Sequence, residues 1–309
     1  MTPLRFDGRT AVVTGAGSNP GLGRAHALLL AARGANVVVN DVAETAATPG
    51  STGIVSAEAV ADEIRATGGR AVAVTASVAD EDGAATIVAA AVEAFGGIDI
   101  LVNNAGISIA APFDAMTARD FRRHIDVNLL GAAWMCRAAW PSMKAQGYGR
   151  IVNTTSSAMT GFADQAAYAA SKGGLWSLTR ALAAEGGALG IRVNAVSPGA
   201  YTRLVAGMME EDSPLLHHSR ANLPAELASP VVAVLAHEAC PVTGECIDAV
   251  GGEVRRTFVG RTAGFTDRAL TPEMVRARWS DVMAEEEATS VGIAAVDTSE
   301  WKLKPYRGC

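Results

Sequence analysis

The sequence predicts an α/β fold in which a doubly wound, parallel sheet is covered by helices on both faces, so that the chain forms three layers. Short β-branched apolar runs alternate with longer alanine- and leucine-rich segments, as in strands joined by helical crossovers. A glycine-rich turn joins the first strand to the first helix. The 309 residues are 49% hydrophobic and 19% charged, which supplies a sizeable core and argues against global disorder.

The elements follow from this alternation in chain order. A strand at 10–14 ends at glycines and leads into an alanine- and leucine-rich helix at 22–33 and a β-branched strand at 36–40. The rest of the alternation is read from helical and alternating apolar spacing: helix 56–67, strand 71–75, helix 81–95, strand 99–102, a long helical region 117–146, strand 150–154, helix 167–185, strand 191–195, helix 224–237 and a short strand 245–248.

Two segments break the rhythm. Residues 42–55 follow the second strand without a clear pattern, and the pattern changes again beyond Gly251. We therefore expect one core domain over residues 1–252 and a C-terminal extension over residues 253–309. The extension is weakly patterned from about Ser290 and is expected to be loosely held there.

Composition excludes several classes of protein. The net charge is −6 and the pI is near 5.4; without a basic block, nucleic acid or an anionic membrane is not expected as the main partner. The start shows no signal-peptide apolar core, and no apolar run reaches the length of about 18 residues that a membrane span needs. The cysteines are scattered, so we expect free thiols in a reducing cytoplasm and no zinc site or disulfide frame: Cys136, Cys240, Cys246 and Cys309.

The run TGAGSNPGLG at residues 14–23 is suited to bind a dinucleotide. Glycine allows a sharp turn and a close approach of the backbone to a pyrophosphate, and the following helix offers free N–H groups and a positive dipole end. The expected contacts are Gly15, Gly21, Leu22 and Gly23. A glycine-rich loop alone is often only a loop, but its place between the first strand and helix favours nucleotide binding.

Asp41 ends the second predicted strand. A carboxylate there can accept hydrogen bonds from both hydroxyls of the adenosine ribose and would repel a 2′-phosphate. No Arg or Lys precedes Gly21 in the glycine-rich loop to offset that repulsion. The sequence therefore predicts NAD as cofactor in preference to NADP, with a turn-forming Asn-Asp pair as the alternative reading.

Further cofactor contacts are expected at the carboxyl edge of the sheet, where open α/β sheets bind ligands. Ser77 and Val78 follow the third strand and can flank the adenine. The run NNAG at 103–106 follows the fourth strand. Asn103 can position the cofactor or brace the sheet, and Asn104, Ala105 and Gly106 are candidate cofactor contacts.

Tyr168 and Lys172 are four residues apart on a predicted helix, so both side chains lie on one face. A phenol titrates near 10, and a nearby ammonium is expected to lower that pKa. The pair can then act as a proton donor and acceptor. A solvated helix face is the ordinary explanation of such a pair, but its place behind a nucleotide-binding half favours a catalytic role.

Four motifs occur in order: TGx₅GLG, NNAG, Tyr168-x₃-Lys172 and SPG at 197–199. Together they resemble the short-chain dehydrogenase/reductase family over residues 6–252. The resemblance implies a Rossmann-like fold, a nicotinamide cofactor contacted also by Tyr168, Lys172, Pro198 and Gly199, and a catalytic set of Asn128, Ser156, Tyr168 and Lys172.

A narrower likeness extends to about residue 288. The segments VND, RAAW, YGRI, HEAC and TPEMV, with Trp279, resemble the (3R)-hydroxyacyl-CoA dehydrogenase domains of peroxisomal multifunctional enzymes and related bacterial 17β-hydroxysteroid dehydrogenases. This likeness implies a bulky hydrophobic alcohol or ketone as substrate, such as a 3-hydroxyacyl-CoA or a hydroxysteroid.

The chain departs from the family pattern in two places. Five residues, and not the usual three, separate Gly15 from the Gly-x-Gly pair, which leaves Ser18 and Asn19 open as contacts. Counting forward from the strand at 151–154 places the catalytic serine at Ser156, whereas counting thirteen residues back from Tyr168 gives Thr155. Ser156 is preferred and Ser157 is the remaining candidate; a polar strand end is the alternative for the whole run.

The resemblance also implies a role for each catalytic residue. Tyr168, as phenolate, takes the hydroxyl proton in oxidation, while Lys172 lowers its pKa and holds the nicotinamide ribose. Ser156 binds the substrate oxygen. Asn128 would hold a water that relays protons from Lys172, or would merely cap or kink its helix.

Residues 199–223 are expected to form a lid over the substrate. Their apolar side chains suit an acyl chain or a sterol, although ordinary packing explains them as well: Tyr201, Met208, Met209, Leu215 and Leu216. Adjacent histidines such as His217 and His218 rarely converge on one ion, so no metal is expected.

Three functions compete. The leading hypothesis is an NAD-dependent dehydrogenase of a bulky hydrophobic secondary alcohol in lipid or steroid metabolism. The second is a reductase of a small terpenoid or polyketide ketone. The third is a non-catalytic NAD-binding regulator, for which an intact Asn, Ser, Tyr and Lys set is unnecessary.

Two larger features complete the expectations. The helices at 117–146 and 167–185 carry apolar side chains suited to an isologous interface, and we expect a homo-oligomer, most simply a tetramer: Trp134, Trp140, Leu175, Trp176 and Leu178. In the extension, Thr271 and Pro272 start a helix whose stripe of Val275, Trp279 and Val282 is predicted to dock on the core or a neighbouring subunit near the lid. A surface helix away from the site is the alternative.

Overall fold

The computed structural model describes residues 2–42 and 56–293. The expectations for residues 43–55 and for 294–309 therefore lie outside the described residues. The chain separates into two compact units, Met1–Arg256 and Thr257–Cys309, close to the boundary predicted at Gly252. Each unit is described by itself.

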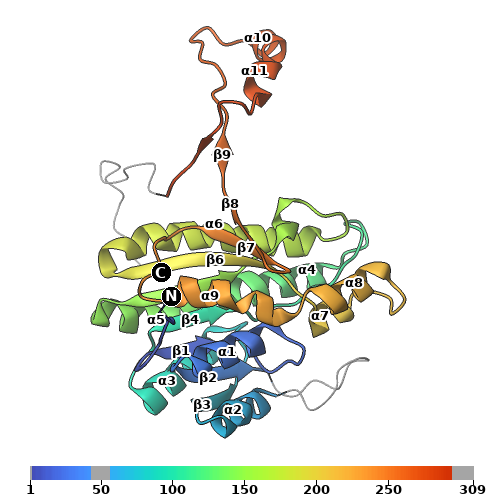
Figure 1. Cartoon of the computed structure of the whole chain (residues 1–309). Coiled ribbons are helices and arrows are strands. Elements are labelled where there is room, and N and C mark those ends of the chain that lie inside the picture. Colours follow the sequence, from blue (N-terminus) through green and yellow to red (C-terminus); the bar gives the residue numbers. More distant parts are fainter. Residues whose placement is uncertain (1, 43–55, 294–309) are drawn as a thin grey trace. The chain divides into compact units, whose positions relative to one another are not determined.

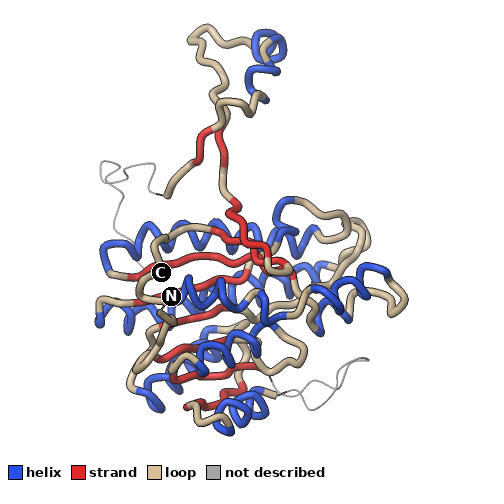
Figure 2. Tube along the Cα trace, viewed as in Figure 1, coloured by secondary structure: helices blue, strands red, loops and turns tan. Residues whose placement is uncertain are grey.

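The first unit is built on one eight-stranded sheet with the order β3-β2-β1-β4-β5-β6-β7-β8 (Figure 2). Strands β1 to β7 pair in parallel, so the predicted doubly wound parallel sheet is confirmed. The strands are β1 Thr10–Val13, β2 Asn36–Asp41, β3 Arg70–Thr75, β4 Ile100–Asn103, β5 Gly149–Thr154, β6 Ile191–Gly199, β7 Cys246–Val250 and β8 Glu253–Thr257.

Helices cover both faces of this sheet (Figure 1). On one face α1 packs against α2 and α9, and on the other α3 packs against α5, with α6 beside the π-helical turn that precedes α5. The helices are α1 Leu22–Ala32, α2 Ala57–Ala66, α3 Glu81–Phe95, α4 Ala118–His124, α5 Gly131–Gln146, α6 Ala166–Gly186, α7 Arg203–Ala206, α8 Pro214–Asn222 and α9 Ser229–Ala236. The valines of β1 and β2 are fully buried between the layers.

The long helical region expected at 117–146 is continuous but not uniform. Its middle turn, Ile125–Leu130, is π-helical and joins α4 to α5. A π turn adds one residue to the helical repeat and often occurs at functional sites. Asn128 lies in this turn and is buried.

The end of the sheet differs from the prediction. Strand β6 continues past Ala195 to Gly199, because Ser197 pairs with Asp248 and Gly199 with Val250 of β7. An eighth strand, β8, was not predicted. It follows β7 after Gly251 and Gly252, whose φ angles are 57° and 88°. A two-residue hairpin of type I′ needs positive φ at both positions, and glycine supplies it.

The second unit contains two short helices and a small ribbon. Strands β9 Gly260–Arg261 and β10 Thr289–Ser290 pair antiparallel. Helices α10 Pro272–Ala277 and α11 Trp279–Met283 follow one another with a break at Arg278. The Thr271 side chain accepts a hydrogen bond from Met274 N, 3.2 Å away, as the predicted cap requires. The break means that Val275 and Trp279 do not share one continuous helix.

A search of the described residues for membrane spans finds no helix with the length and apolar character needed to cross a bilayer.

Candidate active site

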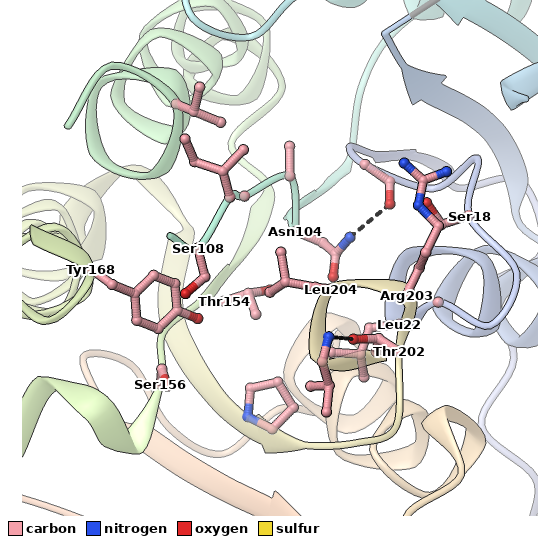
Figure 3. A pocket seen from close by; sticks show the side chains of 18 of the residues that line it. Ser18, Leu22, Asn104, Ser108, Thr154, Ser156, Tyr168, Thr202, Arg203 and Leu204 are labelled. Atoms are coloured by element: carbon pink, nitrogen blue, oxygen red, sulfur yellow. Dashed lines mark hydrogen bonds between the residues drawn. The ribbon is translucent and has the colours of Figure 1, made fainter. Parts of the chain in front are cut away.

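A cavity of about 660 Å³ lies at the carboxyl ends of six adjacent strands, β3 to β6 in sheet order. The loops that follow these strands line it, together with the start of α1 and the segment around α7 (Figure 3). Parallel sheets bring strand ends from distant parts of the sequence to one edge, and ligands bind there.

The structure brings nearly all the predicted site residues to this one cavity. Gly23 and Asn128 are the exceptions, and Ser18 lines the cavity whereas Asn19 does not. The predicted residues that line it are Gly15, Gly21, Leu22, Asp41, Ser77, Val78, Asn104, Ala105, Gly106, Ser156, Tyr168, Lys172, Pro198 and Gly199.

Asn104 fastens the glycine-rich loop to the end of β4. Its side-chain amide donates to the carbonyls of Thr14 and Gly15, at 2.9 and 3.0 Å. The two segments are so close that a Cβ on Gly15, whose φ is +63°, would lie 2.7 Å from Ala105 Cα. A Cβ on Gly23 would lie 2.6 Å from Asn104 Nδ2. Gly23 therefore serves helix packing and is not a lining residue.

The start of α1 is suited to hold an anion. Within the described residues the N-cap Gly21 makes no side-chain capping bond, whereas Ser56, Asp80 and Thr117 cap α2, α3 and α4 with side-chain oxygens. The first N–H groups of a helix need an acceptor, and a phosphate is a good one. The residues present thus fit the pyrophosphate of a dinucleotide.

Asp41 lines the cavity and also shapes the loop. One carboxylate oxygen accepts from Gly17 N at 2.8 Å, and the other accepts from Val42 N at 2.8 Å. A carboxylate has about four acceptor positions, so these two bonds leave capacity for ribose hydroxyls. The negative charge remains beside the position where a ribose would lie.

Asn103 braces the sheet and does not line the cavity. Its amide donates to Asn153 Oδ1 at 2.9 Å, and Asn153 Nδ2 donates to Thr179 Oγ1 at 2.9 Å. All three side chains are buried. This network ties β4 to β5 and α6, which settles the choice that the sequence left open.

Ser156, Tyr168 and Lys172 meet at the inner end of the cavity. Lys172 is 3% exposed, donates to Thr154 O at 2.7 Å, and its Nζ lies 5.6 Å from the centroid of the Tyr168 ring. Burial raises the pKa of the Tyr168 phenol, and a hydrogen bond with Ser156 acts in the opposite direction. Burial also lowers the pKa of Lys172 to about 8.

These pKa shifts correct one expectation. Lys172 was predicted to lower the pKa of Tyr168, but the net shift of Tyr168 is upward and Lys172 is not among its causes. Desolvation disfavours the charged form of both groups. Burial therefore favours the neutral forms of Tyr168 and Lys172 relative to the same pair on a solvated helix face.

The structure distinguishes the three candidates for the catalytic hydroxyl, Thr155, Ser156 and Ser157. The Thr155 hydroxyl donates to Val196 O at 3.0 Å and contacts Cys246 Sγ, so it is engaged in the sheet. Ser157 is exposed and is not part of the cavity lining. Ser156 lines the cavity beside Tyr168, which supports the preferred assignment.

The side chain of Asn128 is held by other protein groups. Its Oδ1 accepts from Ile107 N at 2.8 Å, and its Nδ2 donates to Ile107 O at 2.9 Å and to Ser171 Oγ at 3.0 Å. The side chain is thus occupied by protein groups and does not line the cavity. These bonds position the segment after β4, and the predicted water relay from Lys172 stays a prediction.

The predicted lid at residues 199–223 contributes to the cavity lining some of the side chains that were expected and others that were not. Met208 lines the cavity, but Leu216 is fully buried in the protein and Leu215 is 58% exposed. Tyr201 accepts a hydrogen bond from Arg220 at 3.2 Å. The residues of this segment that line the cavity and were missed are Ala200, Thr202, Arg203, Leu204, Val205 and Gly207. Thr202 caps α7 through Val205 N, which was readable as a helix start after the SPG motif.

Ser108 and Thr154 are further lining residues that the sequence analysis missed (Figure 3). Nothing in the local sequence marks either of them. His217 and His218 are exposed, and within the part of the chain that the structure describes no group of three His, Cys, Asp or Glu side chains could hold a metal.

Comparisons with known proteins agree with this geometry. The family model described as short chain dehydrogenase matches residues 9–213. A short-chain type dehydrogenase/reductase of Mycobacterium tuberculosis is 39% identical over 276 residues, covering 89% of this chain and 93% of that protein. The crystal structure of a short chain dehydrogenase from Mycobacterium avium has a TM-score of 0.76 and 37% identity, covering 94% of this chain and 99% of that one.

A longer relative is the peroxisomal multifunctional enzyme type 2 of Drosophila melanogaster. It is 40% identical over 298 residues, which cover 94% of this chain and 48% of the fly protein. The chain thus spans about half the length of this multifunctional relative.

Proposed function

The chain belongs to the short-chain dehydrogenase family, and from that premise we propose that it is an NAD-dependent dehydrogenase of secondary alcohols with a bulky hydrophobic group. The class includes 3-hydroxyacyl-CoA thioesters and hydroxysteroids. One observation carries the proposal: a single cavity joins the glycine-rich loop and Asp41 to Ser156, Tyr168 and Lys172.

Each group has a place in the proposed chemistry. A bound nicotinamide dinucleotide supplies the hydride acceptor or donor. Tyr168 exchanges the proton of the substrate hydroxyl, and Ser156 binds the same oxygen and stabilises its developing charge. Lys172 is fixed by Thr154 O and, with Tyr168, would hold the ribose next to the nicotinamide.

Other lining residues would bind the remaining parts of the cofactor and of the substrate. Asp41 would bind the adenosine ribose, Ser77 and Val78 the adenine, and Pro198 with Gly199 the nicotinamide. An apolar wall is available for the substrate: Ile107, Phe162, Leu204, Val205 and Met208.

A reductase of a small terpenoid or polyketide ketone would use the same residues, so a panel of alcohols and ketones has to separate the two. Membership of a dehydrogenase family argues against a non-catalytic regulator. A cytoplasmic location remains a prediction. The word peroxisomal in the name of the fly relative describes that protein.

The cofactor preference tests the proposal directly. We expect kcat/KM to favour NAD over NADP with any accepted alcohol, because the Asp41 carboxylate repels a 2′-phosphate. Asp41→Asn retains an oxygen that can accept from Gly17 N and removes the charge, and it should narrow the preference about tenfold, equivalent to roughly 1.4 kcal/mol. A wild-type preference for NADP would exclude the assigned role of Asp41.

A further inference from the structure

The short segment after β4 is held from both sides by buried polar side chains. Asn128 binds the N–H and the carbonyl of Ile107, at 2.8 and 2.9 Å. The N–H of Ile109 donates to His124 Nε2 at 3.0 Å. The residue between these two anchored positions is Ser108, so its backbone is fixed at both ends.

The second anchor depends on the tautomer of His124, which its two hydrogen-bond partners indicate. His124 is fully buried, and its Nδ1 lies 2.8 Å from the carbonyl of Asp120. A carbonyl only accepts, so Nδ1 carries the proton and Nε2 is free to accept from Ile109. The same imidazole packs edge-on against the Tyr168 ring, with centroids 6.3 Å apart. His124 thus fixes the Ser108 segment relative to Tyr168.

The side-chain hydroxyl of Ser108 is buried without a hydrogen-bond partner among the described residues, although the residue lines the cavity. In Figure 3 the hydroxyls of Ser108 and Tyr168 point into the same space, with Ser156 nearby. A buried hydroxyl without a hydrogen-bond partner is energetically unfavourable. A ligand with an oxygen that accepts a hydrogen bond from Ser108 therefore binds more favourably than one without it.

We propose that Ser108 is a third hydroxyl of the reaction centre and donates a hydrogen bond to a second oxygen of the substrate, a carbonyl two bonds from the carbinol carbon. The inference rests on the proposed function. Tyr168 and Ser156 already provide the acceptor and the donor that the carbinol oxygen needs. A 3-hydroxyacyl group carries its two oxygens on the same short chain and can present both to this cluster.

Substrate choice follows from this arrangement. A site built to hydrogen-bond a substrate group discriminates against analogues that lack the group, because the site's own polar atom then stays unpaired. Among the substrates of the proposed function, Ser108 therefore selects 3-hydroxyacyl compounds over hydroxysteroids.

The test uses two probes of seven chain atoms each, ethyl 3-hydroxybutyrate and 2-heptanol, which differ in the ester group and therefore in the carbonyl. In Ser108→Ala we expect kcat/KM for the ester to fall roughly 10- to 100-fold and kcat/KM for 2-heptanol to stay within about twofold of wild type. Ser157→Ala is the matched control, since its hydroxyl lies outside the cavity lining, and it should leave both values unchanged. NADH affinity, followed by fluorescence, should be equal in all three proteins.

The outcomes separate two failures. An equal loss on both probes, or no loss on either, overturns the role of Ser108 and leaves the dehydrogenase proposal standing. A wild-type enzyme that oxidises neither probe overturns the proposed substrate class and the Ser108 inference with it.

Discussion

At the scale of single residues, the chemistry of this site is governed by desolvation as much as by neighbouring charges. Burial raises the pKa of Tyr168 and lowers that of Lys172 to about 8. A positive charge brought into the cavity favours phenolate and lowers the pKa of both groups. The proton-transfer group is therefore expected to reach its working state only when the cavity is filled.

Tyr168→Phe should lose turnover and keep cofactor binding. The substitution removes the phenol oxygen that we propose exchanges the substrate proton, and such groups typically contribute about 10²–10⁴-fold to the rate. Turnover and NADH binding should be measured on the variant and on Tyr148→Phe, whose ring lies between Arg9 and Arg150 outside the cavity. Near-native turnover in Tyr168→Phe would assign the proton transfer to another group.

His26 makes the fold sensitive to acid. It is buried on α1, with Nδ1 2.8 Å from Ser229 Oγ, and burial lowers its pKa from 6.5 to about 3. Between those values the unfolded imidazole binds a proton and the folded one does not, so stability falls as pH falls through this window. The loss approaches about 1.4 kcal/mol per pH unit well below pH 6.5 and stops near pH 3.

Urea unfolding at pH 7, 6 and 5 checks this contribution. The stability advantage of wild type over His26→Gln should shrink as the pH falls, whereas His217→Gln, at an exposed position, should follow wild type at every pH. Parallel pH profiles for wild type and His26→Gln would show that His26 titrates normally.

At the scale of elements, α1 packs closely against the loop after β4, and we expect this contact to be required for the proposed dinucleotide site. Gly23→Ala would place a Cβ 2.6 Å from Asn104 Nδ2 and 2.8 Å from Ala16 Cα, so the start of α1 must move. We expect a lower Tm and roughly tenfold weaker NADH binding, because overpacking costs about 1–3 kcal/mol. In the control Gly97→Ala, the nearest atom to the new Cβ is 3.8 Å away, and an equal loss there would show that the Gly23 effect is not one of packing.

The π-helical turn at Ile125–Leu130 is a second element that shapes the site. It carries Asn128, and α4 before it carries His124. The two side chains meet the segment after β4 from this one helical region. Apolar periodicity predicts a helix over residues 117–146, but it does not reveal the extra residue in one turn.

At the scale of the whole molecule, we predict a homo-oligomer. Trp134, Trp140, Trp176 and Leu178 on α5 and α6 are only partly buried in the single chain, whereas Leu175 is buried and drops out of the predicted surface. In an isologous contact the same side chains of both subunits would be buried against each other. Light scattering should give a multiple of the 31.7 kDa chain mass, and a monomer at micromolar concentration would refute the prediction.

The C-terminal extension is predicted to need a partner surface. Within that unit Trp279 is 56% and Met283 is 59% exposed, and burying such side chains is favourable by about 1.5–3 kcal/mol each. Truncation at Gly260 should therefore lower thermal stability and raise KM if the extension docks near the substrate. Unchanged values for both would exclude the docking and the lid role.

The sequence by itself determined the features that depend only on residues close together in the chain. The strand–helix alternation, the glycine-rich turn and the Tyr168–Lys172 spacing are local patterns, and they suffice to predict the fold class and several of the residues that line the cavity. Only the tertiary structure decided which hydroxyl of the run 155–157 lies beside Tyr168, that Asn103 braces the sheet, and that Asn128 and His124 anchor Ser108. These outcomes depend on contacts between residues distant in sequence, because strand register and long-range hydrogen bonds determine where each side chain points.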